Sequence, residues 1–394
     1  MLSRRGASAL VRLGSAAAAV AAATLYFPRR GGGDGGAAAH ASTGEQSAPA
    51  EQPRRANSVG AHSFEHSTAK WRVYTDRAAG LVREHKLEEA QAFLFKAVEL
   101  ASSGFGANDP HTAAALHNAA ECCRLRHDTA CAVQFYGRAV DVFRSCRPGG
   151  PELGTALSHL AAALLAHGQA AEAGVAATEA LGHLETALGD AHPASLQARS
   201  LLASVAASQG RHADSAAIMV DVASRAGHEG GHFIAKAAVA CETAGLHSQA
   251  VGFRRELLRR AEEGAEDGGG HARAAAAGVG LAECLMKGGD RKGNKEGKEA
   301  VALLRNAVST SESLFGREHP LVAARKRRLA DALVQLHEHS PGAESAAAAA
   351  AAAKEEAHAL LAAALPPLRK AAESSAAAAE ELRACEESAG RLAK

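Results

Sequence analysis

Three short strings punctuate this chain in the same way, each with a glycine followed a few residues later by a proline. They read GFGANDP ending at Pro110, ALGDAHP ending at Pro193 and LFGREHP ending at Pro320. Glycine favours the left-handed conformation that ends a helix, and proline is favoured at the first position of a new one. The recurrence predicts a stacked helical solenoid, an architecture that holds other molecules.

The prolines also set a period. Pro110 and Pro151 are 41 residues apart, and Pro151 and Pro193 are 42 apart. Within a period the apolar residues recur at helical spacing, and small residues such as Ala120 and Ala132 fall where two antiparallel helices would approach closely. The pattern predicts an all-α chain of paired helices.

These residues resemble the tetratricopeptide repeat (TPR), in the form of about 42 residues typical of kinesin light chains. The usual pieces are L-x-x-L-A-x-x-Y, G-x-x-x-E-A and L-G-x-x-H-P. The third unit carries them at Leu157, Leu160, Ala161, Leu164, Gly168, Ala173, Ala177 and Ala180, followed by Leu188, Gly189, His192 and Pro193. The resemblance covers residues 68 to about 338 and implies a superhelical solenoid of about six to seven helix-turn-helix repeats.

Four segments follow from the pattern. We expect a transit peptide over 1–30, a disordered linker over 31–67, the TPR solenoid over 68–338, and an Ala-rich degenerate last repeat with capping helices over 339–394. Glycine, serine, proline and alanine with scattered charge are typical of a disordered linker. Alanine-rich tracts have high helix propensity but little to bury, so they suit helices that cap a repeat array.

The two ends of the array have their own signals. At the start, Trp71 and Tyr74 on the first helix are expected to close that end of the array. Near the end we expect a helix over 352–364, a break at Pro366-Pro367 and then a solvated C-terminal helix, because proline lacks the amide hydrogen that a helix interior needs.

The N-terminus carries five arginines and no acidic residue before Asp34. This composition matches an organelle transit peptide and favours the mitochondrion, with chloroplast, secretion or cytosol as alternatives. Residues 7–27 are alanine-rich and long enough to span a bilayer only if Arg12 is tolerated, so any membrane contact is expected through this segment alone.

Composition narrows the class of partner. The formal net charge is +1, which gives no electrostatic argument for binding nucleic acid. With aromatic residues at 4% and much alanine, one elongated helical array fits better than several globular domains. We therefore do not expect nucleic acid as the partner; the resemblance to the TPR implies a protein or peptide partner.

One string resembles a zinc-protease motif. HEGGH at 228–232 fits H-E-x-x-H, in which two histidines on one helical face bind metal. That chemistry needs a continuous helix, and Gly227, Gly230 and Gly231 indicate a break between repeats instead. A polar loop is the preferred interpretation, and a zinc hydrolase remains a remote alternative.

Other candidates for chemistry are weaker. The insert GGDRKGNKEGK lacks the spacing of a phosphate loop. The seven cysteines contain no C-x-x-C, and Cys123 and Cys241 fall at buried repeat positions, which predicts reduced core thiols, with zinc or a disulfide as the minor alternative. We expect no catalytic residues, no metal and no cofactor.

The resemblance implies a binding surface. In such repeats the first helix of each pair lines the concave side, where it meets an extended peptide or a partner's helix. Asn118 matches the second asparagine of the L-N-N-L-A pattern that contacts cargo peptide in kinesin light chains, whereas His159, Leu201 and Lys236 depart from it. By repeat position the candidate partner-binding residues are Arg72, Asp76, Asn118, Glu121, His159, Lys236, Glu283, Arg327 and Arg328.

The sequence therefore favours a non-enzymatic, mitochondrial scaffold or assembly factor that binds a protein partner. It looks like the mitochondrial TPR proteins that assist respiratory-complex assembly, on the combination of transit peptide and repeats alone. The alternative is a kinesin-light-chain-related cytosolic cargo adaptor, which would call for a heptad coiled coil that residues 1–67 do not contain.

Overall fold

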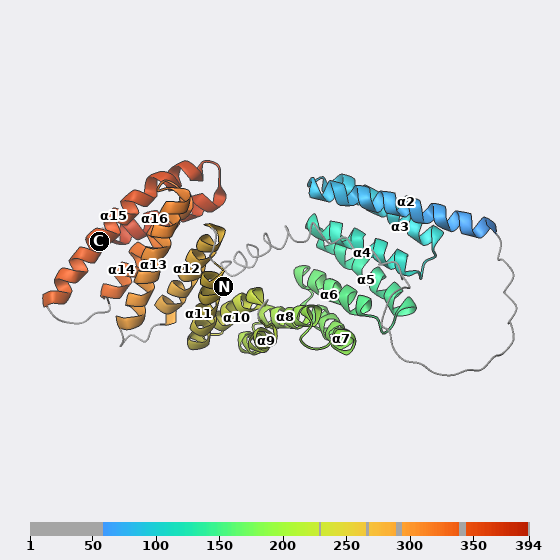
Figure 1. The fold of residues 1–394 in the computed structure, drawn as a ribbon, viewed down its shortest axis with the longest axis horizontal. Helices are drawn as coiled ribbons and strands as arrows, with labels where there is room; N and C mark the ends of the chain where they lie inside the picture. Colours follow the sequence, from blue (N-terminus) through green and yellow to red (C-terminus); the bar gives the residue numbers. More distant parts are fainter. Residues whose placement is uncertain (1–57, 228–229, 265–267, 289–293, 339–343, 393–394) are drawn as a thin grey trace, which may run out of the picture. The chain divides into compact units, whose positions relative to one another are not determined.

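The computed structural model describes residues 58–227, 230–264, 268–288, 294–338 and 344–392. These residues form fifteen α-helices, α2 to α16, and no strand (Figure 1). The all-α prediction is confirmed. The predicted transit peptide lies outside the described residues, as does the predicted linker up to residue 57.

The chain divides into two compact units, Met1–Gln209 and Gly210–Lys394. In the first unit α2 packs on α3, α4 on α5 and α6 on α7, and each hairpin packs on the next, with α8 following α7. The helices are α2 (Ser58–Arg83), α3 (Leu87–Gly104), α4 (Pro110–Leu125), α5 (Thr129–Cys146), α6 (Pro151–Ala166), α7 (Ala170–Leu188) and α8 (Pro193–Ser208).

The second unit repeats the arrangement. α9 is followed by the hairpins α10/α11, α12/α13 and α14/α15, and α16 packs on α15 and touches α14. Its helices are α9 (His212–Arg225), α10 (Gly231–Thr243), α11 (His247–Glu263), α12 (Gly268–Gly288), α13 (Asn294–Phe315), α14 (Pro320–Glu338), α15 (Glu344–Ala372) and α16 (Ala376–Leu392).

The glycine–proline strings form one repeated junction. Gly106, Gly189 and Gly316 have φ of 104°, 93° and 82°, a left-handed conformation that glycine adopts without steric cost. Pro110 and Pro193 then begin α4 and α8, as predicted.

The residue before each proline caps the new helix. An Asp109 carboxylate oxygen accepts from the His111 amide at 2.8 Å. In the other two junctions the Nδ1 atoms of His192 and His319 accept, each at 3.1 Å, from the amide of the residue that follows the proline. Such caps satisfy amides that a helix start leaves free, so an aspartate or a histidine can serve before the proline.

The core is made mainly of alanine and leucine, which lets the paired helices come close. At Gly154 on α6, an added Cβ would lie 2.7 Å from Leu184 Cγ and 3.2 Å from the Ala180 carbonyl oxygen, both on α7. Only a residue without a side chain fits this crossing. Because the paired helices approach so closely, small side chains such as alanine are enough to fill the space between them.

Ion pairs join consecutive second helices. Arg144 on α5 donates from Nη2 to both carboxylate oxygens of Glu179 on α7, at 2.7 and 2.9 Å. In the second unit Arg255 on α11 pairs with Glu299 on α13 at 2.9 Å, and Arg305 on α13 pairs with Glu356 on α15 at 2.8 Å. Each exposed pair contributes about 0.5 kcal/mol, so the series fixes the alignment of neighbours more than it stabilises the fold.

The described helices differ from the predicted segments at both ends. α2 begins at Ser58, so the linker predicted over 31–67 overlaps it. No proline interrupts the chain between Pro53 and Pro110, which lets the helix start early.

The break predicted at Pro366-Pro367 is wrong, because both prolines lie inside α15. Leu361, Ala364 and Leu368 continue one buried stripe across them. The burial of this stripe against α14 and α16 outweighs the amide bonds that the prolines forgo.

Trp71 does not close the free end of the array. Its buried ring meets Phe105 and His111 edge-on, with centroids 6.2 and 5.5 Å away. Since His111 belongs to α4, Trp71 is directed towards the following hairpin.

No described helix is long and apolar enough to cross a membrane.

The close crossing at Gly154 gives a stability test. Gly154→Ala should lower the free energy of unfolding by about 1–3 kcal/mol, because Leu184 and the α7 backbone have to move. Gly182→Ala on α7 is the control: its Cβ would meet nothing within 4 Å, so higher helix propensity should raise stability by up to about 1 kcal/mol. Urea unfolding followed by circular dichroism measures both, and equal effects would contradict the crossing.

Candidate functional site

Polar side chains gather on one face of the first unit, where the first helices α4 and α6 meet. We call the cluster of His117, Glu121, Arg124, Tyr136 and His159 the inner polar cluster. His117 and His159 lie at neighbouring positions of successive repeats, and His159 Nδ1 is 3.0 Å from His117 Nε2. Their rings are 4.7 Å apart between centroids. One ring must donate and the other accept, so the pair is satisfied without a charge.

Glu121 forms the charged half of the cluster. Arg124 donates to both of its carboxylate oxygens, one turn away on α4, and the Tyr136 hydroxyl donates to Glu121 Oε2 at 2.7 Å. Tyr136 comes from the second helix α5 and is fully buried. These bonds compensate the cost of holding a carboxylate almost out of water.

The pKa values of the cluster are displaced from their usual range. Burial, with a further contribution from His159, holds the pKa of His117 well below its usual value. Desolvation lowers the pKa of His159, although Glu121 acts in the opposite sense. For Glu121 burial raises the pKa, but Arg124 and Tyr136 outweigh it and the net pKa is lowered. Burial raises the pKa of Tyr136, and the neighbouring Glu121 carboxylate raises it further.

The other candidates in this unit are placed differently. Asn118 is fully buried, so its amide is enclosed by protein instead of facing solvent. Arg72 and Asp76 are exposed on α2. The structure therefore brings together Glu121 and His159 of the five residues predicted here, and it buries Asn118 in the core.

The second unit presents its candidates separately. Lys236 on α10 is exposed, with Nζ 5.9 Å from the centroid of the Phe233 ring, and desolvation lowers its pKa. Arg328 pairs with Glu283 at 2.9 Å, and Arg327 pairs with Asp331 at 2.9 Å and with Glu381 at 3.0 Å. Glu381 lies on α16, so both predicted arginines already form ion pairs with this last helix.

Sequence reasoning missed three members of the inner polar cluster. Arg124 could have been found, since a carboxylate inside a helix invites a cation three residues later. His117 stands where the L-N-N-L-A pattern has its first asparagine, directly before Asn118. Tyr136 gave no signal, because an aromatic residue of the second helix is usually core, and its hydroxyl finds Glu121 only in three dimensions.

The HEGGH string does not lie in one helix. α9 ends at Arg225 and α10 begins at Gly231, with Gly227 between them at φ of 57°. His228 and Glu229 lie outside the described residues, as do residues 289–293 of the basic insert. Within the described ranges no three histidine, cysteine or acidic side chains are grouped to hold a metal ion.

The prediction of a reduced thiol at Cys123 is wrong. Cys123 at the end of α4 and Cys131 at the start of α5 form a disulfide, with Cα atoms 5.8 Å apart. The hairpin turn places the two positions opposite one another, which their sequence spacing did not indicate. Cys241 is a buried free thiol whose pKa is raised by burial, as expected of a core cysteine.

The geometry defines a class: each unit is a stack of helical hairpins, and in the first unit polar side chains gather where the first helices α4 and α6 meet. Residues 72–145 match the model of the tetratricopeptide repeat family, so the resemblance to this repeat is confirmed. No curated protein matches the sequence.

Several solved structures are similar to the chain. One is a putative kinesin light chain with TPR-like repeats from Podosopora anserina, 17% identical, covering 64% of this chain and 97% of that one at a TM-score of 0.39. Another is the apo quorum sensor NprR from B. thuringiensis, 15% identical, covering 77% and 79% at a TM-score of 0.46.

Protonation of the histidine pair should weaken the fold. Because the folded pKa of His117 is lowered, the unfolded chain binds the proton more readily, and stability falls as the pH drops below about 6.5. The slope per proton is at most about 1.4 kcal/mol per pH unit. His117→Gln should flatten the fall between pH 7 and 5.5 in urea unfolding.

A matched control is His358→Gln on α15, where the histidine is exposed. This variant should keep the wild-type slope. If His117→Gln and wild type lose stability in parallel on acidification, burial of a neutral His117 is not what sets the slope.

Proposed function

We propose that the chain is a non-enzymatic scaffold or assembly factor that binds an extended segment of a partner protein on the inner polar cluster. The observation that carries the proposal is the cluster itself: the His117–His159 pair lies beside Glu121, which Tyr136 and Arg124 hold, and the pKa values of these two histidines, of Glu121 and of Tyr136 are all displaced. Perturbed titratable groups gathered in this way mark candidate functional sites.

The chemistry of the cluster suits a peptide backbone. A neutral histidine ring carries one donor and one acceptor, the same complement as a peptide group. His159 keeps part of its surface open to solvent above the buried His117. It can therefore meet a backbone amide or carbonyl while its Nδ1 stays with His117.

Glu121 contributes by holding the cluster in place. Arg124 and Tyr136 fix its carboxylate, so the partner meets a preorganised surface and loses less entropy on ordering it. Asn118 is fully buried and belongs to the packed core, so the proposal gives it no contact with the partner. The proposed contact is therefore centred on a histidine, in keeping with the departure of His159 from the asparagine pattern of kinesin light chains.

We further propose a mitochondrial location, on the basis of the acid-free, arginine-containing residues 1–30. This segment lies outside the described residues. N-terminal sequencing of the chain recovered from isolated mitochondria tests it: a clipped N-terminus supports the proposal, and an intact Met1 recovered only from cytosol contradicts it.

Binding can be tested without knowing the partner. A phage library of peptides from disordered protein regions is selected on the full-length chain, and enriched peptides are measured by fluorescence polarisation. His159→Glu should weaken their binding about tenfold or more, because a carboxylate cannot donate to the backbone and repels Glu121.

The control is Val175→Glu on α7, a valine that is 71% exposed and away from the cluster. It should leave the affinity unchanged. Equal affinities for wild type and His159→Glu, with folding intact by circular dichroism, would place the peptide site elsewhere.

A further inference from the structure

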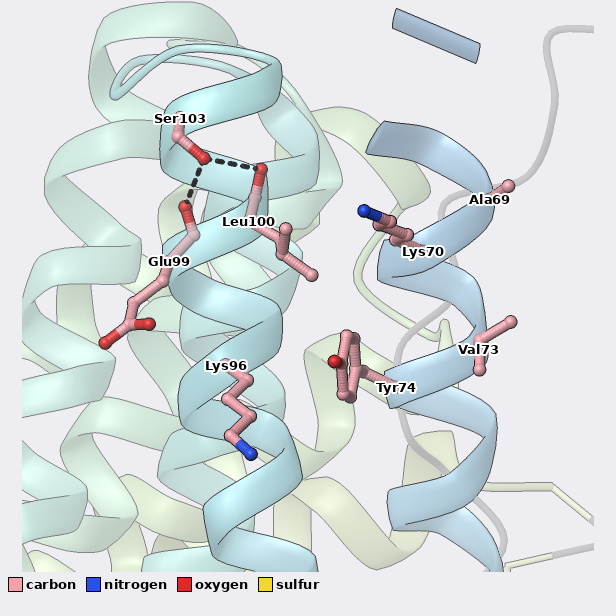
Figure 2. Close-up of a pocket in the computed structure, with 8 residues that line it drawn as sticks. All are labelled: Ala69, Lys70, Val73, Tyr74, Lys96, Glu99, Leu100 and Ser103. Atoms are coloured by element: carbon pink, nitrogen blue, oxygen red, sulfur yellow. Dashed lines mark hydrogen bonds between the residues drawn. The ribbon is translucent and has the colours of Figure 1, made fainter. Parts of the chain in front are cut away.

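The first hairpin carries a groove on the side of α2 and α3 that no described helix covers. Its volume is about 800 Å³, and it is lined by Ala69, Lys70, Val73, Tyr74, Lys96, Glu99, Leu100 and Ser103 (Figure 2). Val73 is 65% exposed, although valine is usually buried in a repeat. Its lining combines the apolar side chains of Val73, Tyr74 and Leu100 with the cations of Lys70 and Lys96.

The following repeats show what normally covers this position. When the repeats are aligned on Ala78, Ala120 and Ala161, Val73 corresponds to Ala115 and Ala156, each 1% exposed. Ala156 packs with Val140 and Phe143 of α5, the second helix of the repeat before it. Ala115 lies in the same cluster as Leu94 and Val98 of α3. In both later repeats the position is a seat for an α-helix.

Tyr74 belongs to the same seat. Its equivalents Leu116 and Leu157 are fully buried, whereas Tyr74 is only partly covered and packs on Phe93, with ring centroids 5.8 Å apart. Trp71, which could have closed this end, is directed to α4. Among the described helices, none lies on this seat of the first hairpin.

The charges of the groove indicate which helix would fit. Aligned on Ala97 and Ala180, Lys96 corresponds to Glu179, which receives Arg144 from the second helix of the preceding repeat. At the first hairpin the sign is reversed, because a lysine stands where the carboxylate stood. The matching group on an incoming helix is therefore a carboxylate.

Lys70 adds a second cation on the opposite wall. In Figure 2 the Lys70 amine projects from α2 towards α3, the Lys96 side chain runs along α3, and the Glu99 carboxylate points away from α2. Within the described part of the chain, no ion pair engages Lys70 or Lys96. Both remain available to an acidic partner.

We propose that this groove docks an amphipathic helix of a partner protein, with its apolar stripe on Val73, Tyr74 and Leu100 and carboxylates against Lys70 and Lys96. The helix takes the place that α3 and α5 hold over the later repeats. Binding here extends the array by one helix and uses a face different from the inner polar cluster, so it is independent of the proposed function.

The test uses the full-length chain and a phage library of amphipathic helices as long as α3, which has 18 residues. The apolar stripe is constant, and the flanking positions carry either glutamate or lysine. Glutamate-flanked helices should be enriched on wild type. Val73→Asp and Lys96→Glu should each weaken them about tenfold, and the double variant Lys70→Glu, Lys96→Glu should select lysine-flanked helices.

Two matched controls separate the sites. Val175→Asp changes an equally exposed valine on α7, and His159→Glu changes the inner polar cluster; neither should affect helix binding. No enrichment, or enrichment that survives Val73→Asp, overturns the proposal.

The chain itself could also fill the seat, and cross-linking distinguishes this case. The purified full chain with Val73→p-benzoylphenylalanine is irradiated without any partner. A cross-link to residues 1–57 or to a second copy would overturn a partner helix as the occupant. A monomer free of cross-links, together with capture of the selected helix at position 73, supports it.

Discussion

The junction between hairpins is the constraint on which the rest of the structure depends. A glycine such as Gly189 turns the chain through a left-handed conformation, and the capping side chain of His192 and the ring of Pro193 then start the next helix. The hydroxyl of Ser195 ties the junction together by donating to the Gly189 carbonyl oxygen at 2.7 Å. The same junction recurs before α4 and α14. Before α6 only the proline is kept: Gly150 is extended and offers no side-chain cap, and Pro151 begins the helix that carries His159 to the side of His117.

Local rules explain what the sequence could predict. Helix starts at Pro110 and Pro193 and the alanine-rich crossings need only neighbouring residues, so the all-α fold was accessible. The continuation of α15 through Pro366 was not, because it depends on burial of Leu361 and Leu368 against helices distant in sequence. At these prolines the burial of apolar side chains outweighs the low helix propensity of proline.

The candidate site was accessible only in part, for a related reason. Repeat position located Glu121 and His159 on the same face. It could not reveal that Asn118 is enclosed, that Tyr136 reaches Glu121 from the second helix, or that Glu381 of α16 holds Arg327. Repeat position predicts which face a residue occupies, whereas its hydrogen-bond and ion-pair partners depend on the side chains of the neighbouring helices.

The ion pairs between second helices have a consequence for how the molecule comes apart. The ion pairs Arg144–Glu179 and Arg305–Glu356 each join one hairpin to its immediate neighbour. Because each hairpin contacts only its neighbours, a stack of this kind loses order from its ends. Among the described helices, α2 and α3 have a neighbouring hairpin on one side only. Opening there breaks the contacts of one junction instead of two, and a helix seated in the groove of the first hairpin would oppose that opening.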